Sequence, residues 1–134
     1  MIGYDESMTN ISLRGYVGLG EVKKIYEEAC IGMCTLLATP NHINSNPIKI
    51  FEYMSAGLAV ICSDFPKWKE IVEENNCGIC VDPNNTEQIS GAIDELLENP
   101  KRIVELGNNG RMAAINKYNW QIEEKKLLDF VNQL

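Results

Sequence analysis

The sequence predicts an α/β fold in which helices cover both faces of a parallel sheet. Segments with apolar residues at helical spacing alternate with short apolar runs along most of the 134 residues. The run 58–62 is apolar throughout, which is typical of a strand buried on both faces. Strands that alternate with helices in this way form a parallel sheet, because each helix carries the chain back across the sheet.

The first third of the chain predicts two strands and one helix. Residues 11–17 have strand composition, and residues 19–30 carry apolar side chains at helical spacing. Residues 33–37 form a short apolar run that predicts the second strand. A polar loop over 39–46 follows, and it leads into the most distinctive segment of the chain.

That segment predicts a short helix over 47–56. Pro47 suits the first helical position, where its missing N–H would have no intrahelical partner. Gly57 can take the left-handed conformation that stops a helix. Most of the helix is apolar, and at about 100° per residue Lys49 and Glu52 fall on one narrow face. We expect a largely buried helix with one polar stripe.

The second half predicts two more strands, which gives four in total, and further helices. The strands are 58–62 and 78–81. Asn85 with Gln88 three residues later indicates a capping box at a helix start. Helices are expected over 67–75, from Asn85 to Asn99-Pro100, from Pro100 onward, and over 120–130. Gly107 and Gly110 should weaken the middle of the helix that starts at Pro100. Tyr118 and Trp120 are expected to dock the last helix.

Composition and charge exclude several classes of protein. The net charge of −7 argues against a nucleic-acid binder, which needs clustered Lys and Arg. No apolar run approaches the roughly 20 residues of a membrane span, and the first six residues lack the basic and apolar regions of a signal peptide. We therefore expect one cytoplasmic domain over residues 1–134, large enough to bury roughly 68% of its unfolded surface.

Five cysteines raise the alternative of a metal site. Cys77 and Cys80 have CxxC spacing, and Cys30 with Cys34 would complete a four-thiolate zinc site. Cys34, Cys62 and Cys80 lie in strand-like apolar runs, where thiols behave as small hydrophobic side chains. We expect no metal site and a reducing compartment.

The pattern itself locates a candidate site. Ligands of parallel α/β sheets bind at the carboxyl ends of the strands. The helix over 47–56 starts from a loop at such an end, so its N-terminus suits an anion and Glu52 suits a hydroxyl-bearing group. We therefore expect a site beside Asn46, Lys49 and Glu52, near the loops 17–20, 39–46 and 63–66.

At this point the residues resemble a known family. The stretch 46–61, Asn-Pro-Ile-Lys-Ile-Phe-Glu-Tyr-Met-Ser-Ala-Gly-Leu-Ala-Val-Ile, is similar to the nucleotide-sugar-binding segment of retaining GT-B glycosyltransferases, the "glycosyl transferases group 1" family (family 4). The resemblance implies a Rossmann-like sheet that forms part of the C-terminal, donor-binding domain. Weaker agreement in order and spacing extends it over 13–120, at Leu-Arg-Gly-Tyr-Val, Ile-Tyr-Glu-Glu-Ala, Cys-Ser-Asp-Phe-Pro, Glu-Ile-Val-Glu-Glu-Asn, Cys-Gly-Ile-Cys-Val-Asp-Pro and Tyr-Asn-Trp.

The resemblance also implies roles for individual residues in binding a nucleoside diphosphate sugar. Glu52 matches the second of two glutamates separated by seven residues, whose carboxylate binds the nucleotide ribose. Asn44 stands where the first glutamate belongs, so a role that needs its charge is in doubt. The backbone amides of Ile48 and Lys49 are expected to face the diphosphate. Lys49 Nζ is expected to bind either the phosphates or Glu52, and the backbone of Tyr16 and Val17 is expected to lie beside the base.

His42, the sole histidine, is a candidate contact to the transferred sugar, although a lone loop histidine is more often incidental. No catalytic residue is assigned in this chain. The resemblance implies transfer with retention to an acceptor such as a growing polysaccharide or glycolipid, with no cofactor beyond the donor substrate.

The resemblance covers only the later part of a donor domain. The N-terminal acceptor domain is expected to be absent, so we expect the chain to be a truncated gene product or an excised piece, inactive alone and prone to self-association through uncovered apolar surface. Two alternatives remain open. One is a non-catalytic binding or interaction module derived from the fold, and the other is a fragment of a sugar-nucleotide epimerase.

Overall fold

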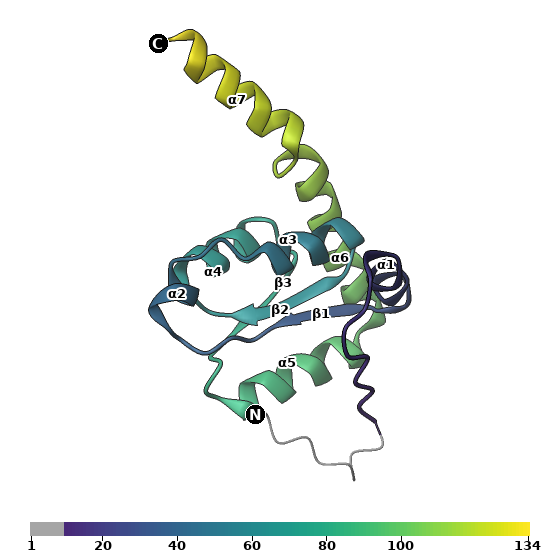
Figure 1. Ribbon diagram of the computed structural model, residues 1–134. Helices are drawn as coiled ribbons and strands as arrows, with labels where there is room; N and C mark the ends of the chain where they lie inside the picture. Colours follow the sequence, from purple (N-terminus) through teal and green to yellow (C-terminus); the bar gives the residue numbers. More distant parts are fainter. Residues whose placement is uncertain (1–9) are drawn as a thin grey trace.

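The computed structural model describes residues 10–134 and contains a three-stranded parallel sheet flanked by helices (Figure 1). The strands lie side by side in chain order, β1-β2-β3. The predicted α/β fold class is confirmed. The elements are α1 (Leu19–Glu28), β1 (Ile31–Cys34), α2 (Pro40–Ile43), α3 (Ile48–Ala56), β2 (Ala59–Ser63), α4 (Pro66–Glu74), β3 (Gly78–Val81), α5 (Thr86–Glu98), α6 (Pro100–Asn116) and α7 (Trp120–Asn132).

The central strand β2 is buried along its whole length, as its apolar sequence predicts. Its register with both neighbours is marked by cysteines, since Cys62 is opposite Cys34 of β1 and Cys80 of β3. Side chains of successive β2 residues point to opposite faces, so the strand supplies both layers of the core.

Helices α3 and α4 pack on one face of the sheet, and α5 packs on the other (Figure 1). The first layer is centred on Ile50, Met54 and Trp68, which are at most 1% exposed. The second joins Ile61 to Leu96 of α5. Helix α6 contributes to both layers, with Leu106 in the second and with Ala113 and Ala114 in the first.

The strand predictions for the first part of the chain need correction. Residues 11–17 form no strand and lie in coil and a bend before α1, where Gly15 has a φ of 63° that interrupts an extended backbone. The strand predicted over 33–37 lies at Ile31–Cys34, where it pairs with Ala59–Cys62, while Leu36 and Leu37 are exposed. The described residues therefore contain three strands instead of the predicted four.

The helix ends follow local sequence signals with small differences. Gly57 ends α3 with a φ of 79°, as predicted. Pro47 lies one position earlier than predicted, as the N-cap of α3. Asn85 caps α5 by accepting from the backbone of Glu87 and Gln88, but the Gln88 side chain accepts from the Asp82 N–H instead of closing a capping box. The loop predicted over 39–46 contains the short helix α2.

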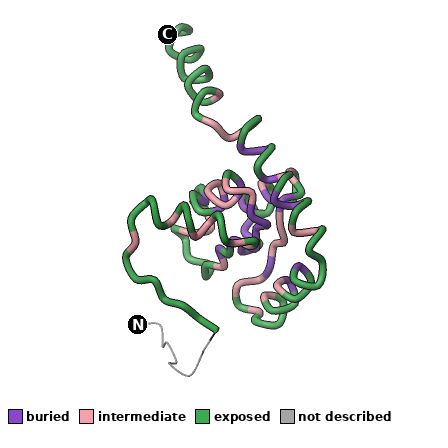
Figure 2. Tube along the Cα trace, turned by 90° about the vertical axis from the view of Figure 1, so that its right-hand side faces the viewer, coloured by how far each residue is buried: buried purple, intermediate pink, exposed green. Residues whose placement is uncertain are grey.

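Helix α7 extends away from the rest of the molecule and buries none of its residues (Figures 1 and 2). The prediction that Trp120 docks this helix is wrong, because its side chain is 68% exposed. Tyr118 packs on Phe51 of α3, with 5.0 Å between ring centroids, and so anchors the end of α6. Within residues 10–134, no helix has both the length and the apolar composition that crossing a bilayer requires.

Candidate functional site

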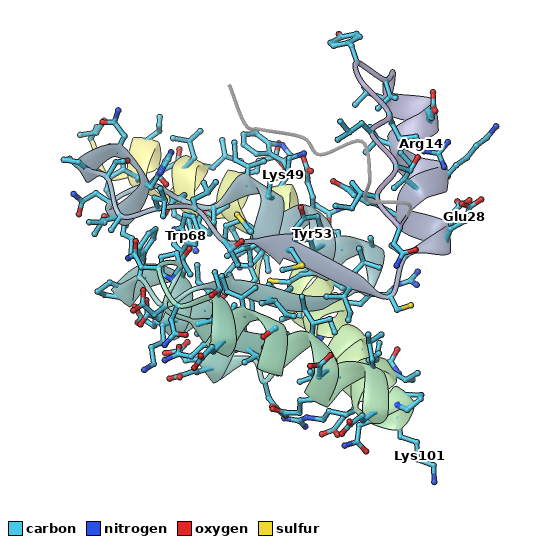
Figure 3. The ribbon with its side chains drawn as sticks, turned by 90° about the horizontal axis from the view of Figure 1, so that it is seen from below. Arg14, Glu28, Lys49, Tyr53, Trp68 and Lys101 are labelled. Atoms are coloured by element: carbon cyan, nitrogen blue, oxygen red, sulfur yellow. The ribbon has the colours of Figure 1, made fainter. Side chains whose placement is uncertain are left out.

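Helix α3 presents the predicted site residues on the side that does not face the sheet. Ile50 and Met54 are fully buried against the sheet, whereas Ile48 is 71% exposed. In Figure 3, Lys49 and Tyr53 lie on the part of the molecule toward α1, and Trp68 lies on the far side. The site is therefore built where α3 meets α1.

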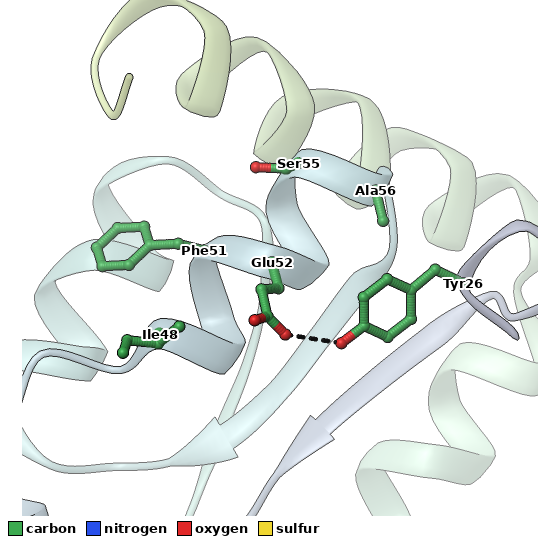
Figure 4. A pocket seen from close by; sticks show the side chains of 6 residues that line it. All are labelled: Tyr26, Ile48, Phe51, Glu52, Ser55 and Ala56. Carbon is green, nitrogen blue, oxygen red and sulfur yellow. Dashed lines mark hydrogen bonds between the residues drawn. The ribbon is translucent and has the colours of Figure 1, made fainter. Parts of the chain in front are cut away.

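Two donors hold one oxygen of the Glu52 carboxylate. The Tyr26 hydroxyl donates to Glu52 Oε2 over 2.8 Å (Figure 4). Lys49 Nζ donates to the same oxygen over 2.9 Å. These hydrogen bonds, from Lys49 and then Tyr26, lower the pKa of Glu52 below its usual value. The described residues direct no hydrogen bond to Oε1, so an ionised, oriented carboxylate keeps one oxygen free to accept.

Sequence reasoning missed Tyr26. Its apolar neighbours in α1 predicted only packing, and its ring does pack edge-to-face on Tyr53 with 5.8 Å between centroids. Burial and the neighbouring carboxylate of Glu52 raise the pKa of the Tyr26 hydroxyl, so it remains a donor at neutral pH. No local sequence signal marks Tyr26, because its contact with Glu52 joins two residues that lie 26 positions apart on different helices.

An open groove of about 470 Å³ runs along α3 beside this carboxylate (Figure 4). A smaller hollow of about 240 Å³ shares Tyr26, Ser55 and Ala56 with it and adds Lys23 and Arg111. An apolar wall with one carboxylate acceptor suits a ring that carries hydroxyl groups. The groove is lined by Tyr26, Ile48, Phe51, Glu52, Ser55 and Ala56.

The N-terminus of α3 offers one unbonded amide among the described residues. The Ile48 N–H donates to Asn46 O over 3.0 Å, and Ile50 and Phe51 donate to Pro47 O. This leaves the Lys49 N–H as the donor at the positive end of the helix. The expected amide contacts of Ile48 and Lys49 with a ligand stay predictions.

The loop before α3 is held by its own hydrogen bonds. His42 Nδ1 lies 3.0 Å from Leu37 O, and Asn44 Nδ2 donates to Pro40 O over 3.3 Å. The buried indole of Trp68 donates to Ser45 O over 3.1 Å and fixes the loop to α4. The structure thus gives His42 and Asn44 partners within the loop.

The remaining predicted residues are spread around the α3 site. Asn46 is exposed, and the described residues give its side chain no hydrogen-bond partner. Tyr16 and Val17 lie in the coil before α1, and Tyr16 is fully exposed. The structure brings together Lys49, Glu52 and the unpredicted Tyr26, and it records no hydrogen bond from Tyr16 or Val17 to α3.

Four of the five cysteines pack in or against the core, and Cys30 is exposed. Across residues 10–134, no group of three or more His, Cys, Asp or Glu is placed to hold a metal ion. Cys62 Sγ and Cys80 Sγ lie 3.8 Å apart across neighbouring strands. Burial raises the pKa of Cys77 to about 11, and its thiol donates to Val72 O.

Comparison with known proteins identifies the sequence pattern. Residues 8–113 match the family model described as "Glycosyl transferases group 1". A GDP-mannose-dependent alpha-(1-6)-phosphatidylinositol monomannoside mannosyltransferase of Mycobacterium tuberculosis is 31% identical over 84 residues, which cover 63% of this chain and 22% of that protein. A sucrose synthase of Denitrovibrio acetiphilus is 26% identical over 87 residues, which cover 62% of this chain and 11% of the relative.

A solved structure shows the same fold. Sucrose-phosphate synthase from Thermosynechococcus elongatus superposes with a TM-score of 0.71 at 23% identity, over 81% of this chain and 26% of the synthase chain. The chain thus spans about a quarter or less of the proteins it matches, and its fold is that of part of a GT-B enzyme. Because the family model covers most of the sequence, the chain belongs to the glycosyl transferases group 1 family.

Proposed function

We propose that this chain is the donor-binding part of a retaining glycosyltransferase and takes a nucleoside diphosphate sugar. The observation that carries the proposal is the Glu52 carboxylate, which Tyr26 and Lys49 orient beside a groove while its Oε1 remains available. A carboxylate in this state accepts two hydroxyl hydrogen bonds well, as a ribose requires. The whole enzyme would act in the cytoplasm on an acceptor such as a growing polysaccharide or glycolipid.

The diphosphate would lie at the N-terminus of α3. The free Lys49 N–H and the helix dipole favour negative charge there. Lys49 Nζ is 2.9 Å from Glu52 Oε2 and its side chain is 58% exposed, so it can turn to a phosphate at little cost. In this arrangement one lysine shields Glu52 in the free protein and neutralises phosphate in the complex.

Turnover would need a second domain, because one wall of a cleft cannot position both donor and acceptor. The partner we propose is an N-terminal acceptor domain in the same enzyme. We expect the 134 residues alone to bind nucleotide without transferring sugar.

Titration of UDP, GDP and ADP into isotope-labelled protein, followed by amide NMR shifts, tests the proposal. We expect one nucleotide to shift the amides of Ile48 to Glu52, and Glu52→Gln to weaken that response by about tenfold through the lost carboxylate acceptor. Glu70→Gln, an exposed change on α4, is the matched control. A folded protein in which no nucleotide moves these amides would contradict the proposal.

A non-catalytic binding module is the second candidate. Asn44 favours it, because its amide is turned to Pro40 O in the loop and carries no charge. Restoring the carboxylate with Asn44→Glu distinguishes the two, since a donor site would gain sensitivity to the sugar part of the nucleotide sugar and a module would not.

A further inference from the structure

A second cavity, of about 630 Å³, lies where α3 and α4 meet the junction of α6 and α7. This volume is in the range of pockets that bind small molecules. Phe51 lines both this cavity and the Glu52 groove, so the two sites adjoin across one ring. Of its lining residues, Asn46 belongs to the expected donor site and Phe51 to the Glu52 groove, and the rest have no assigned role.

Three aromatic side chains form its walls. Phe51 and Tyr118 pack against each other with ring centroids 5.0 Å apart, which makes a fixed apolar surface. Trp120 stands beside them and is 68% exposed, and the helix that it begins has no fully buried residue. An exposed indole next to a hollow supplies a flat apolar face for a ring.

The cavity also holds polar groups with capacity to spare. The Asn46 side chain has no hydrogen-bond partner among the described residues. Glu123 Oε1 accepts from Lys126 Nζ over 2.7 Å, which leaves Oε2 free. The Tyr118 hydroxyl accepts from Asn75 over 3.1 Å and can still donate its own proton.

The lining offers an anionic ligand no cationic side chain. Its one charged side chain is the Glu123 carboxylate, and neither Lys nor Arg lines the cavity. A carboxylate repels phosphate but accepts from hydroxyl groups. The lining therefore suits an uncharged ligand with one apolar face and several hydroxyls, which describes a pyranose ring.

We propose that this cavity is a carbohydrate subsite in which an uncharged pyranose ring stacks on Trp120 and bonds to Asn46 and Glu123. The choice of a sugar among neutral ligands rests on the proposed function. The ring would belong to a glycoside or oligosaccharide separate from the nucleotide, held next to the donor groove across Phe51.

The two tryptophans provide the test, since each gives one indole N–H signal in the NMR spectrum of the full chain. Trp68 is 1% exposed and bonded to Ser45 O, so it serves as the internal reference. Methyl α-glucopyranoside, methyl α-mannopyranoside and maltotriose are titrated as probes, with the open-chain polyol sorbitol as control. We expect at least one ring compound to shift the Trp120 indole saturably, and we expect sorbitol and the Trp68 signal to show no change.

Matched variants locate the binding. Glu123→Ala should weaken it about fivefold to tenfold by removing an acceptor, while Glu124→Ala, its exposed neighbour on α7, should not. Trp120→Ala, read at the Asn46 amide, should weaken binding about tenfold, and Phe130→Ala, an aromatic 60% exposed on the same helix, should not.

The outcomes separate the two proposals. A Trp120 indole that no ring compound shifts, or that shifts equally with sorbitol or with a nucleotide, overturns the carbohydrate subsite. Nucleotides that move the Lys49 amide while the sugars move nothing would leave the donor site standing and reject only this cavity. If sugars shift the Trp120 signal and no nucleotide shifts the Lys49 amide, the carbohydrate subsite stands and the donor site is rejected.

Discussion

The Glu52 carboxylate shows how far a single residue can be interpreted from sequence. Helical spacing correctly predicted that Lys49 and Glu52 share a face, and they are joined over 2.9 Å. The second donor, Tyr26, lies 26 residues earlier in another helix. Its contact depends on how α1 packs on α3, and no local pattern encodes that packing.

The two donors make the acidity of Glu52 testable. Because both stabilise the ionised form, its folded-state pKa lies below the ordinary value, and Lys49 is the larger cause. Lys49→Met should therefore raise the Glu52 pKa more than Tyr26→Phe does. Carbon-detected NMR titration of the Glu52 carboxyl group gives its midpoint in the unchanged protein and in each variant. Equal midpoints in all three would refute the two hydrogen bonds to Glu52.

The same shift fixes the sign of a pH effect on stability. A carboxylate whose pKa is lower in the folded state stabilises the protein fully at pH values above its unfolded-state pKa of about 4.3. That contribution is lost as pH falls through the lower folded-state pKa. It amounts to a few tenths of a kcal/mol, because the Glu52 side chain is 39% exposed and the ion pair is screened by solvent.

The cysteines should differ in reactivity by their burial. Cys30 is exposed, whereas Cys34, Cys62 and Cys77 are buried. Burial raises the pKa of Cys77 to about 11, which suppresses its thiolate at neutral pH. Alkylation with iodoacetamide followed by peptide mass mapping should modify Cys30 first, and the buried thiols only in denaturant. Early modification of Cys62 or Cys77 would contradict the packing.

At the scale of elements, helix ends were more predictable than strands. The signals for helix ends are local: Gly57 ends α3 and Asn85 caps α5 as predicted, although the predicted capping box with Gln88 does not form. A strand depends on more than composition, so residues 11–17 have the composition of a strand but lie in coil, with Gly15 at a positive φ. For Gly107 and Gly110 the sequence indicated only that they weaken α6, and the structure adds that Gly107 lies against Gly57 and Gly110 against Met54 and Cys77.

Gly107 lies where α6 crosses the end of α3. A methyl group there would overlap the carbonyl oxygen of Gly57, while a methyl group at Gly91 of α5 would meet nothing within 4 Å. Gly91→Ala should therefore stabilise the protein by about 0.5–1 kcal/mol through helix propensity. Gly107→Ala has the same intrinsic gain, yet it should destabilise the protein by about 1–3 kcal/mol because the crossing must widen.

Urea unfolding followed by circular dichroism measures both variants. The pair serves as its own control, because both changes add one methyl group to a helical glycine. If Gly107→Ala proved as stable as Gly91→Ala, the close crossing of α3 and α6 would be wrong.

At the scale of the whole molecule, alternation of strands and helices was sufficient to predict the fold class. The pattern left open which parts of the chain join the core. Helix α7 has the amphipathic sequence of a docked helix, with Leu127, Leu128 and Val131 each more than half exposed. Among the described residues, α7 has no fully buried side chain, so periodicity correctly predicted the helix and incorrectly predicted its docking.

Removal of most of α7 should therefore leave the remaining fold intact. Deletion of residues 121–134 keeps Trp120 and removes no buried side chain, so we expect the free energy of unfolding to change by less than about 0.5 kcal/mol. Leu106→Ala, at a fully buried position of α6, should by contrast cost about 2–5 kcal/mol. Chemical unfolding compares the two directly. A deletion that costs as much as Leu106→Ala would mean that α7 packs on the core in solution. In that case α7 would also cover the cavity beside Trp120.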